Sequence, residues 1–229
     1  MLTLLLWLGT SFTYADTPLD IHHWWLPNQE ERQAGMKSYL KAHYGVNPPA
    51  QLYPQMVVIH WTGVETAKST WYTFASATLS GRQSLQASGT VNVSAHFLVE
   101  QDGTIHQLLP ENAFARHCIG FNHLAIGIEN VGGKDTLSSA QVEANARLIA
   151  DLQGRYPIEL VIGHHESGHY ESHPFFVEQQ VGYRSIKADP GADFIEAVRV
   201  TLVEQQSYAI QHEVMEEKEP HSPEHGPNK

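Results

Sequence analysis

Two histidines and an aspartate that lie far apart in the chain have the residue types of a catalytic metal site. His60 closes one apolar run, His164 follows another, and Asp189 precedes a Pro-Gly turn that would fix the direction of its carboxylate. His60 alone would be interpreted as a structural histidine bonded to a backbone carbonyl. Together, the three residues match a catalytic zinc site, which has three protein ligands and leaves a fourth position open for water. We therefore predict a zinc ion whose water attacks a carbonyl carbon.

Two further charged residues could serve the same reaction. Glu129 lies within the apolar run AIGIENV, and a carboxylate on a buried strand is costly unless it is paired or functional. Glu129 is therefore either half of a structural ion pair or a general base that passes a proton from the water to the leaving amine. Lys187 precedes Asp189 by two residues, so in an extended segment both would lie on the same side. Its ammonium group could stabilise the developing oxyanion.

Three apolar runs predict the strands that would position these residues. The runs lie at 56–62, 125–131 and 159–162. They are rich in Val and Ile and lack a regular polar alternation, which is typical of strands buried on both faces. The aromatic, irregular segment 114–122 is predicted to be a loop over a cleft.

Helices and a hairpin complete the predicted fold. The pair Asp102-Gly103 between two apolar runs predicts a hairpin. Capping-box patterns at Asn28 and Ser138 each predict the start of a helix. The hairpin strands are expected at 93–100 and 104–109, and the helices at 29–44, 65–79, 138–156 and 192–208. This order favours an α/β fold with a mixed central β-sheet flanked by helices.

The composition limits the classes of partner. The 229 residues suffice for one sizeable core, and 41% of them are hydrophobic. The formal net charge of -11 argues against a nucleic-acid partner, because binding to phosphates requires clustered Lys and Arg. The sequence makes no prediction of the oligomeric state.

The two ends of the chain differ from the middle. Residues 1–15 resemble a secretory signal peptide, although a positive n-region is missing, and their apolar run is too short to be a transmembrane helix. We therefore expect a periplasmic or secreted protein. Residues 16–50 are predicted to be an arm and a helix packed on the domain of residues 51–208. Residues 209–229 form an acidic tail without apolar periodicity, which predicts disorder.

Five short motifs occur in a characteristic order between Met56 and Phe194: VVIHWT, SAHF, IGIENVG, a Gly-His pair after a strand, and KADPG. In this order they resemble the zinc-dependent N-acetylmuramoyl-L-alanine amidases of the type 2 family, which share a fold with the peptidoglycan recognition proteins. The resemblance implies that Glu129 activates the water and Lys187 assists the transition state. It also implies the substrate, which is the amide between N-acetylmuramic acid and L-alanine in peptidoglycan or muropeptides. The implied Zn²⁺ ligands are His60, His164 and Asp189.

The segment between His164 and Asp189 is longer than the family pattern leads us to expect, and it supports two alternatives. His165 is the alternative to His164 as a ligand. The pattern His165-Glu166-Ser167-Gly168-His169 also matches the HExxH motif of zincin metallopeptidases, in which both histidines lie on one face of a helix. The absence of aliphatic residues around this motif and its internal glycine argue against a buried zincin helix. A peptidoglycan-binding module without catalysis is a third hypothesis, which would require the loss of a metal ligand.

Overall fold

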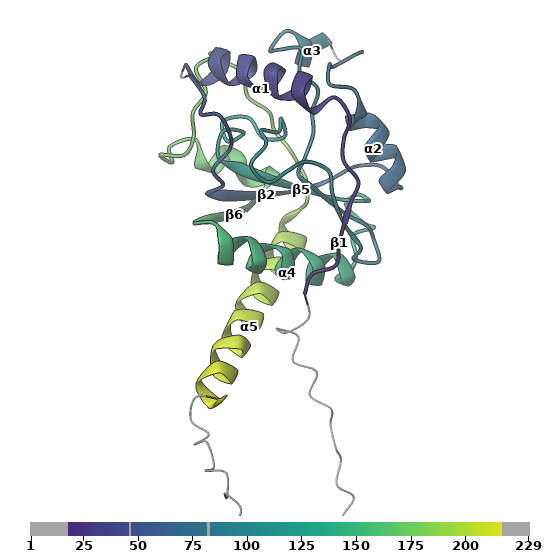
Figure 1. Cartoon of the computed structure of the whole chain (residues 1–229), viewed down its shortest axis with the longest axis vertical. Helices are drawn as coiled ribbons and strands as arrows, with labels where there is room; N and C mark the ends of the chain where they lie inside the picture. The colour runs from purple at the N-terminus through teal and green to yellow at the C-terminus, as the bar shows by residue number, and fades with distance from the viewer. Residues whose placement is uncertain (1–17, 46, 82, 217–229) are drawn as a thin grey trace, which may run out of the picture.

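The computed structural model describes residues 18–45, 47–81 and 83–216. The predicted signal peptide and residues 217–229 of the predicted tail lie outside these residues. The strands occupy the middle of the molecule, with α1 on one side of them and α4 and α5 on the other (Figure 1). The predicted α/β fold with a mixed central sheet flanked by helices is confirmed.

A single six-stranded sheet has the strand order β1-β4-β3-β5-β2-β6. Strand β2 pairs in parallel with β5 and with β6, whereas β3 and β4 form the antiparallel hairpin. The predicted arm contributes β1, which pairs in parallel with β4 at one edge. The strands are β1 (Ile21–His23), β2 (Met56–Trp61), β3 (Phe97–Val99), β4 (Ile105–Gln107), β5 (Ala125–Asn130) and β6 (Leu160–Gly163).

Four helices form where helices were predicted, two of them with different bounds, and two short helices were not predicted. The helices are α1 (Gln29–Tyr44), α2 (Ala67–Ala75), α3 (Gln83–Gln86), α4 (Ser139–Arg155) and α5 (Ala192–Glu216), with a 3-10 helix, η2 (His164–Tyr170). Helix α2 is shorter than predicted. Helix α5 continues past Tyr208 to Glu216, so the prediction of a disordered tail from residue 209 is wrong for this part. Residues 209–216 contain no Pro or Gly, and the first proline after Tyr208 is Pro220, so nothing in this stretch stops the helix.

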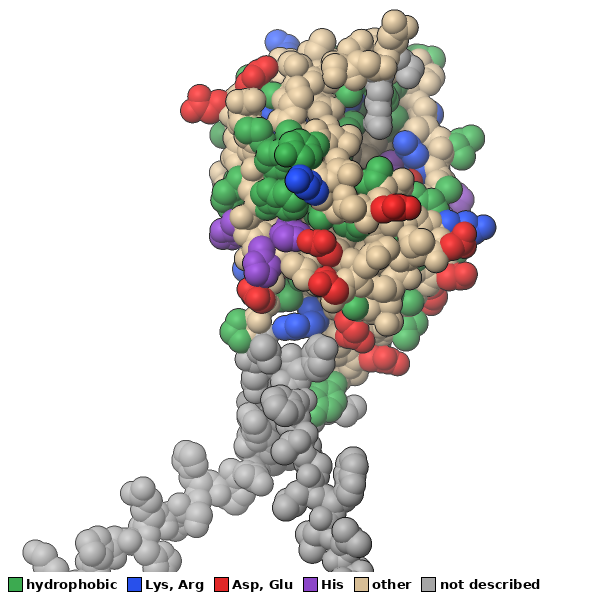
Figure 2. Space-filling model, turned by 90° about the vertical axis from the view of Figure 1, so that its right-hand side faces the viewer, with side chains coloured by type: hydrophobic (Ala, Val, Ile, Leu, Met, Phe, Trp, Pro, Cys, Tyr) green, Lys and Arg blue, Asp and Glu red, His purple; other side chains and the backbone are tan. Residues whose placement is uncertain are grey.

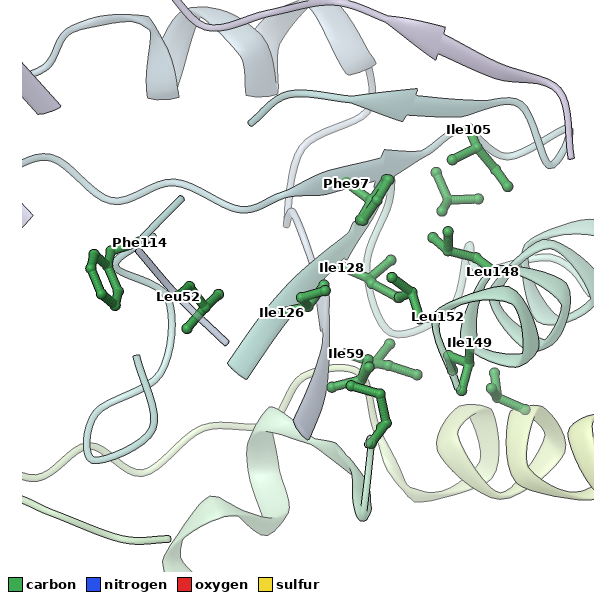
Figure 3. Close-up of a cluster of buried hydrophobic side chains, with 14 of the residues drawn as sticks. Leu52, Ile59, Phe97, Ile105, Phe114, Ile126, Ile128, Leu148, Ile149 and Leu152 are labelled. Atoms are coloured by element: carbon green, nitrogen blue, oxygen red, sulfur yellow. The ribbon is translucent and has the colours of Figure 1, made fainter. Parts of the chain in front are cut away.

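A core of buried side chains joins the sheet to helices α4 and α5, and it also includes residues of α1. Ile59 of β2 and Ile126 and Ile128 of β5 face this core, where they lie against Leu148 and Leu152 of α4 (Figure 3). Because successive side chains of a strand point to opposite faces, the residues between them face the other side of the sheet. On that side His60 of β2 and Glu129 of β5 are paired in register.

Acidic and basic side chains are both scattered over the surface in Figure 2. On the side drawn in Figure 2, Asp and Glu side chains lie singly or in small groups, and the Lys and Arg side chains stand apart from one another. The described residues of this side therefore form no continuous basic surface.

Candidate active site

The carboxyl ends of three parallel strands bring the predicted residues to one edge of the sheet. His60 is the penultimate residue of β2, Glu129 that of β5, and His164 directly follows β6. Ile59 of β2 pairs with Gly163 of β6, so the next residues along both strands, His60 and His164, are neighbours. This edge is where functional sites of parallel sheets form.

His60, His164 and Asp189 converge on one point. The Nδ1 atoms of His60 and His164 are 2.9 Å apart, and Asp189 Oδ2 lies 3.2 Å from the first and 3.0 Å from the second. All three residues are buried. Among the described residues, they form the one group of three or more His, Cys, Asp or Glu that could hold a metal ion.

The donor set fits a zinc ion. Zinc is bound by imidazole nitrogens and carboxylate oxygens at about 2.0–2.2 Å, which places two ligand atoms of a tetrahedral site about 3.4 Å apart. The three observed separations are slightly shorter than this, so a small outward movement accommodates the ion. His60 lies in β2, His164 begins η2 and Asp189 lies just before α5, and all three line a cleft through which a fourth ligand could reach the ion.

The protonation of His164 and Asp189 suits metal binding. Burial, together with the neighbouring His60, lowers the pKa of His164 to about 4, so the imidazole is neutral at neutral pH. Burial raises the pKa of Asp189, but the neighbouring imidazoles of His164 and His60 outweigh this effect and hold the pKa well below its usual value. A neutral imidazole and a carboxylate are the forms that bind zinc.

A cleft of about 320 Å³ opens over this cluster, and both remaining predicted residues line it. Oε2 of Glu129 is buried and has no hydrogen-bond partner in the described part of the chain. Burial raises the pKa of Glu129 to about 7, and the nearby His60 partly opposes this shift. Lys187 is exposed at the rim of the same cleft. A carboxyl group that titrates near neutral pH is suited to general acid-base chemistry.

The HExxH motif is not part of the cluster. Glu166 forms an ion pair with Arg199, at 2.7 Å, and accepts a hydrogen bond from the backbone N–H of Gly163. His165 Nδ1 lies 3.2 Å from the carbonyl oxygen of Asp189 rather than beside its carboxylate. The motif lies in the 3-10 helix η2, where residues three apart share a face and His165 and His169, four apart, do not. The geometry that a zincin requires is therefore absent here.

Sequence reasoning missed one histidine of the site. His117 belongs to the loop that was predicted to lie over a cleft, and it does line the cleft. Its Nδ1 lies 3.1 Å from Nε2 of His60, and its own Nε2 lies 3.2 Å from the carbonyl oxygen of Ala125. Burial and the neighbouring His60 and His96 lower its pKa well below the usual value. A histidine in an irregular loop has no period or motif that would have singled it out.

The comparisons with known proteins identify a family. The family model described as Amidase_2, N-acetylmuramoyl-L-alanine amidase, matches residues 48–192, which is more than half of the chain. The chain belongs to this amidase family. The matched residues include every strand from β2 to β6 and all five predicted site residues.

Individual relatives of this amidase family member include phage endolysins. The endolysin of Escherichia phage T7 is 32% identical over 92 residues, which are 37% of this chain and 61% of the relative. Among solved structures, the N-acetylmuramoyl-L-alanine amidase LysC from Clostridium intestinale is similar with a TM-score of 0.49 and 20% identity, over 82% of this chain and 99% of that one. Human PGRP-IBETAC, solved in complex with glycosamyl muramyl pentapeptide, has a TM-score of 0.44 and 19% identity over 63% of this chain and 80% of its own.

No helix in the described residues is both long enough and apolar enough to cross a membrane.

Proposed function

We propose that this chain is a zinc-dependent hydrolase that cleaves the amide bond between N-acetylmuramic acid and L-alanine in peptidoglycan or muropeptides. The observation that carries the proposal is the meeting of His60, His164 and Asp189 beside the unpartnered carboxyl group of Glu129. Membership of the amidase family supports the choice of bond. The domain that performs the reaction is assigned to residues 51–208, which contain almost all of the family match.

Each predicted residue has a role in the reaction. His60, His164 and Asp189 would hold Zn²⁺, which supplies a polarised carbonyl and a water of lowered pKa when it is bound. Glu129 takes the proton from the attacking water as the new C–O bond forms. As the C–N bond breaks, Glu129 gives this proton to the departing amine of L-alanine. Lys187 lies at the rim, where its ammonium group stabilises the negative charge that develops on the carbonyl oxygen.

The side chains that line the cleft favour a polar substrate. Four Ser and Thr hydroxyl groups line it, and their lone pairs can accept hydrogen bonds from the O–H and N–H groups of sugars and peptides, while three of them donate their own protons to backbone carbonyl oxygens. The four hydroxyl groups are those of Thr62, Thr70, Thr73 and Ser94. The candidate metal ligands and the hydroxyl groups that line the cleft together favour a glycopeptide over an apolar ligand.

The test is incubation of the purified protein with a muropeptide of defined structure. Mass spectrometry should find the intact free stem peptide and the sugar, and a chelator should abolish the activity until Zn²⁺ is added back. Cleavage within the stem peptide would refute the proposal.

A matched pair of variants separates this proposal from a zincin peptidase. Glu129→Gln should abolish hydrolysis while zinc remains bound, because the base is lost and the ligands are intact. Glu166→Gln should retain hydrolysis, because Glu166 is engaged with Arg199. The reverse pattern would favour the HExxH motif.

We also infer that the protein acts outside the cytoplasm, in the periplasm or after secretion. Its proposed substrate is in the cell wall, and residues 1–15 resemble an export signal. N-terminal sequencing of the protein recovered outside the cytoplasm should find a start close to Asp16. A start at Met1 in the recovered protein would contradict this inference.

A further inference from the structure

His60 uses both of its ring nitrogens. Its Nδ1 faces His164 and Asp189, and its Nε2 lies 3.1 Å from Nδ1 of His117. The rings of His60 and His117 are almost perpendicular, at 88°, with centroids 5.2 Å apart. This edge contact aims a nitrogen of one ring at a nitrogen of the other, so a proton must lie between them.

The ring that carries this proton follows from the second hydrogen bond of His117. Nε2 of His117 lies 3.2 Å from the carbonyl oxygen of Ala125, and a carbonyl oxygen can only accept a hydrogen bond. Nε2 of His117 therefore donates, and Nδ1 of the neutral ring presents a lone pair. This lone pair accepts from Nε2–H of His60. With its proton on Nε2, the neutral His60 ring has the lone pair on Nδ1, the atom that faces the metal position.

The chain holds His117 rigidly in this position. The side-chain oxygen of Asn122 accepts hydrogen bonds from the backbone N–H groups of His117 and Cys118, at 2.8 Å each. The His117 ring lies against Gly127 of β5, where a Cβ atom would come within 2.8 Å of its Cγ. Real Cβ atoms do not approach this closely, so the ring occupies space that only a glycine leaves open.

We propose that His117 is a positioning residue, which fixes the tautomer and the ring orientation of His60 so that Nδ1 of His60 is directed at the zinc ion. The inference rests on the proposed function, because it assigns a partner to one of its ligands. Outer partners of this kind orient a ligating imidazole and increase its basicity, and their loss typically weakens metal binding by about 10- to 100-fold.

The test compares three variants of the full chain by zinc affinity, measured in competition with a chromophoric chelator. His117→Phe fills the space but accepts no hydrogen bond, so zinc affinity should fall by about 10- to 100-fold. His117→Asn places an amide oxygen near the position of Nδ1 and should restore most of the affinity. The matched control is His123→Phe, a partly buried histidine whose Nδ1 has no hydrogen-bond partner in the described residues. It should leave zinc affinity unchanged.

A second measurement reports the tautomer directly. In the zinc-bound wild type, ¹⁵N NMR of the imidazole should find His60 protonated on Nε2 and metal-bound through Nδ1, and His117→Phe should broaden or shift these resonances. A stability loss alone would not produce this change.

The outcomes separate the inference from the function on which it rests. Wild-type zinc affinity in His117→Phe, or bonding of zinc through Nε2 of His60, would overturn the inference and leave the hydrolase intact. A wild type that does not bind zinc would overturn both.

Discussion

The buried carboxyl group of Glu129 should cost the metal-free protein stability, and its replacement by glutamine should recover that cost. Oε2 of Glu129 has no hydrogen-bond partner in the described residues, and burial raises the pKa of the group from 4.5 to about 7. The folded state therefore holds the proton more tightly than the unfolded state does. Glutamine has nearly the same shape and carries no charge at any pH. The same substitution should abolish hydrolysis, because glutamine cannot accept the proton from water.

The size of this stability cost follows from the linkage between proton binding and folding. Between pH 4.5 and 7 the folded state binds more protons than the unfolded state, so stability falls as the pH rises through this window. One pKa unit corresponds to about 1.36 kcal/mol, so the full cost above pH 7 is about 3 kcal/mol. Below pH 4.5 both states are protonated and the cost disappears. For a protein of this size, about 3 kcal/mol corresponds to a rise in Tm of roughly 6–12 °C.

The assay is thermal and urea unfolding of the metal-free wild type and Glu129→Gln at pH 5 and pH 8. The variant should be more stable at pH 8, with a smaller difference at pH 5. Glu166→Gln is the control of opposite sign. Burial raises the pKa of Glu166, but hydrogen bonds from Arg199 and Gly163 outweigh this and lower it. Glu166 therefore stabilises the fold above its unfolded pKa, and its replacement should destabilise the protein at pH 8. If Glu129→Gln is no more stable than the wild type at pH 8, the argument from desolvation is wrong.

Two further substitutions test the surroundings of the site. Gly127→Ala should displace the His117 ring, lower the free energy of unfolding by about 1–3 kcal/mol and weaken zinc binding. Gly133→Ala is the control, because its Cβ would meet nothing within 4 Å, and it should change neither quantity. If the two variants had equal effects in urea unfolding and in chelator competition, the packing argument would be wrong. Glu178→Ala should destabilise the protein by about 3–5 kcal/mol, because the side chains of Glu178 and its partner His43 are both fully buried. A loss below about 1 kcal/mol in urea unfolding would show that this pair contributes no more than a solvent-exposed ion pair.

Local patterns predicted most of the fold. The apolar runs that became β2, β5 and β6 were found because strands buried on both faces have a distinct composition. The capping box at Ser138 is present with both of its hydrogen bonds. The one predicted at Asn28 is wrong, because this residue adopts a left-handed conformation with φ 56° and its side chain makes no cap hydrogen bond. Asn adopts the left-handed conformation more readily than most residues. An Asn before a helix can therefore either cap the helix with its side chain or adopt this backbone conformation.

Features that depend on distant partners could not be predicted. The strand β1 has no strong β pattern of its own and exists because β4 offers an unpaired edge. The segment after η2 is held by the buried pair of Glu178 with His43 of α1. These two residues lie far apart in the chain, and no sequence motif connects them. His117 was missed for the same reason, since its partners are a ring on β2 and a carbonyl on β5.

The register of three strands, rather than any one motif, assembles the site. His60 pairs with Glu129 across β2 and β5, and the pairing of Ile59 with Gly163 places His60 beside His164. A slip of one residue in either pairing would turn a functional side chain to the opposite face of its strand, where the apolar core lies. The apolar residues that alternate with the functional ones oppose such a slip, because it would also expose Ile59 or Ile128 to the cleft. The same residues that bury the core therefore fix the distances on which metal binding depends.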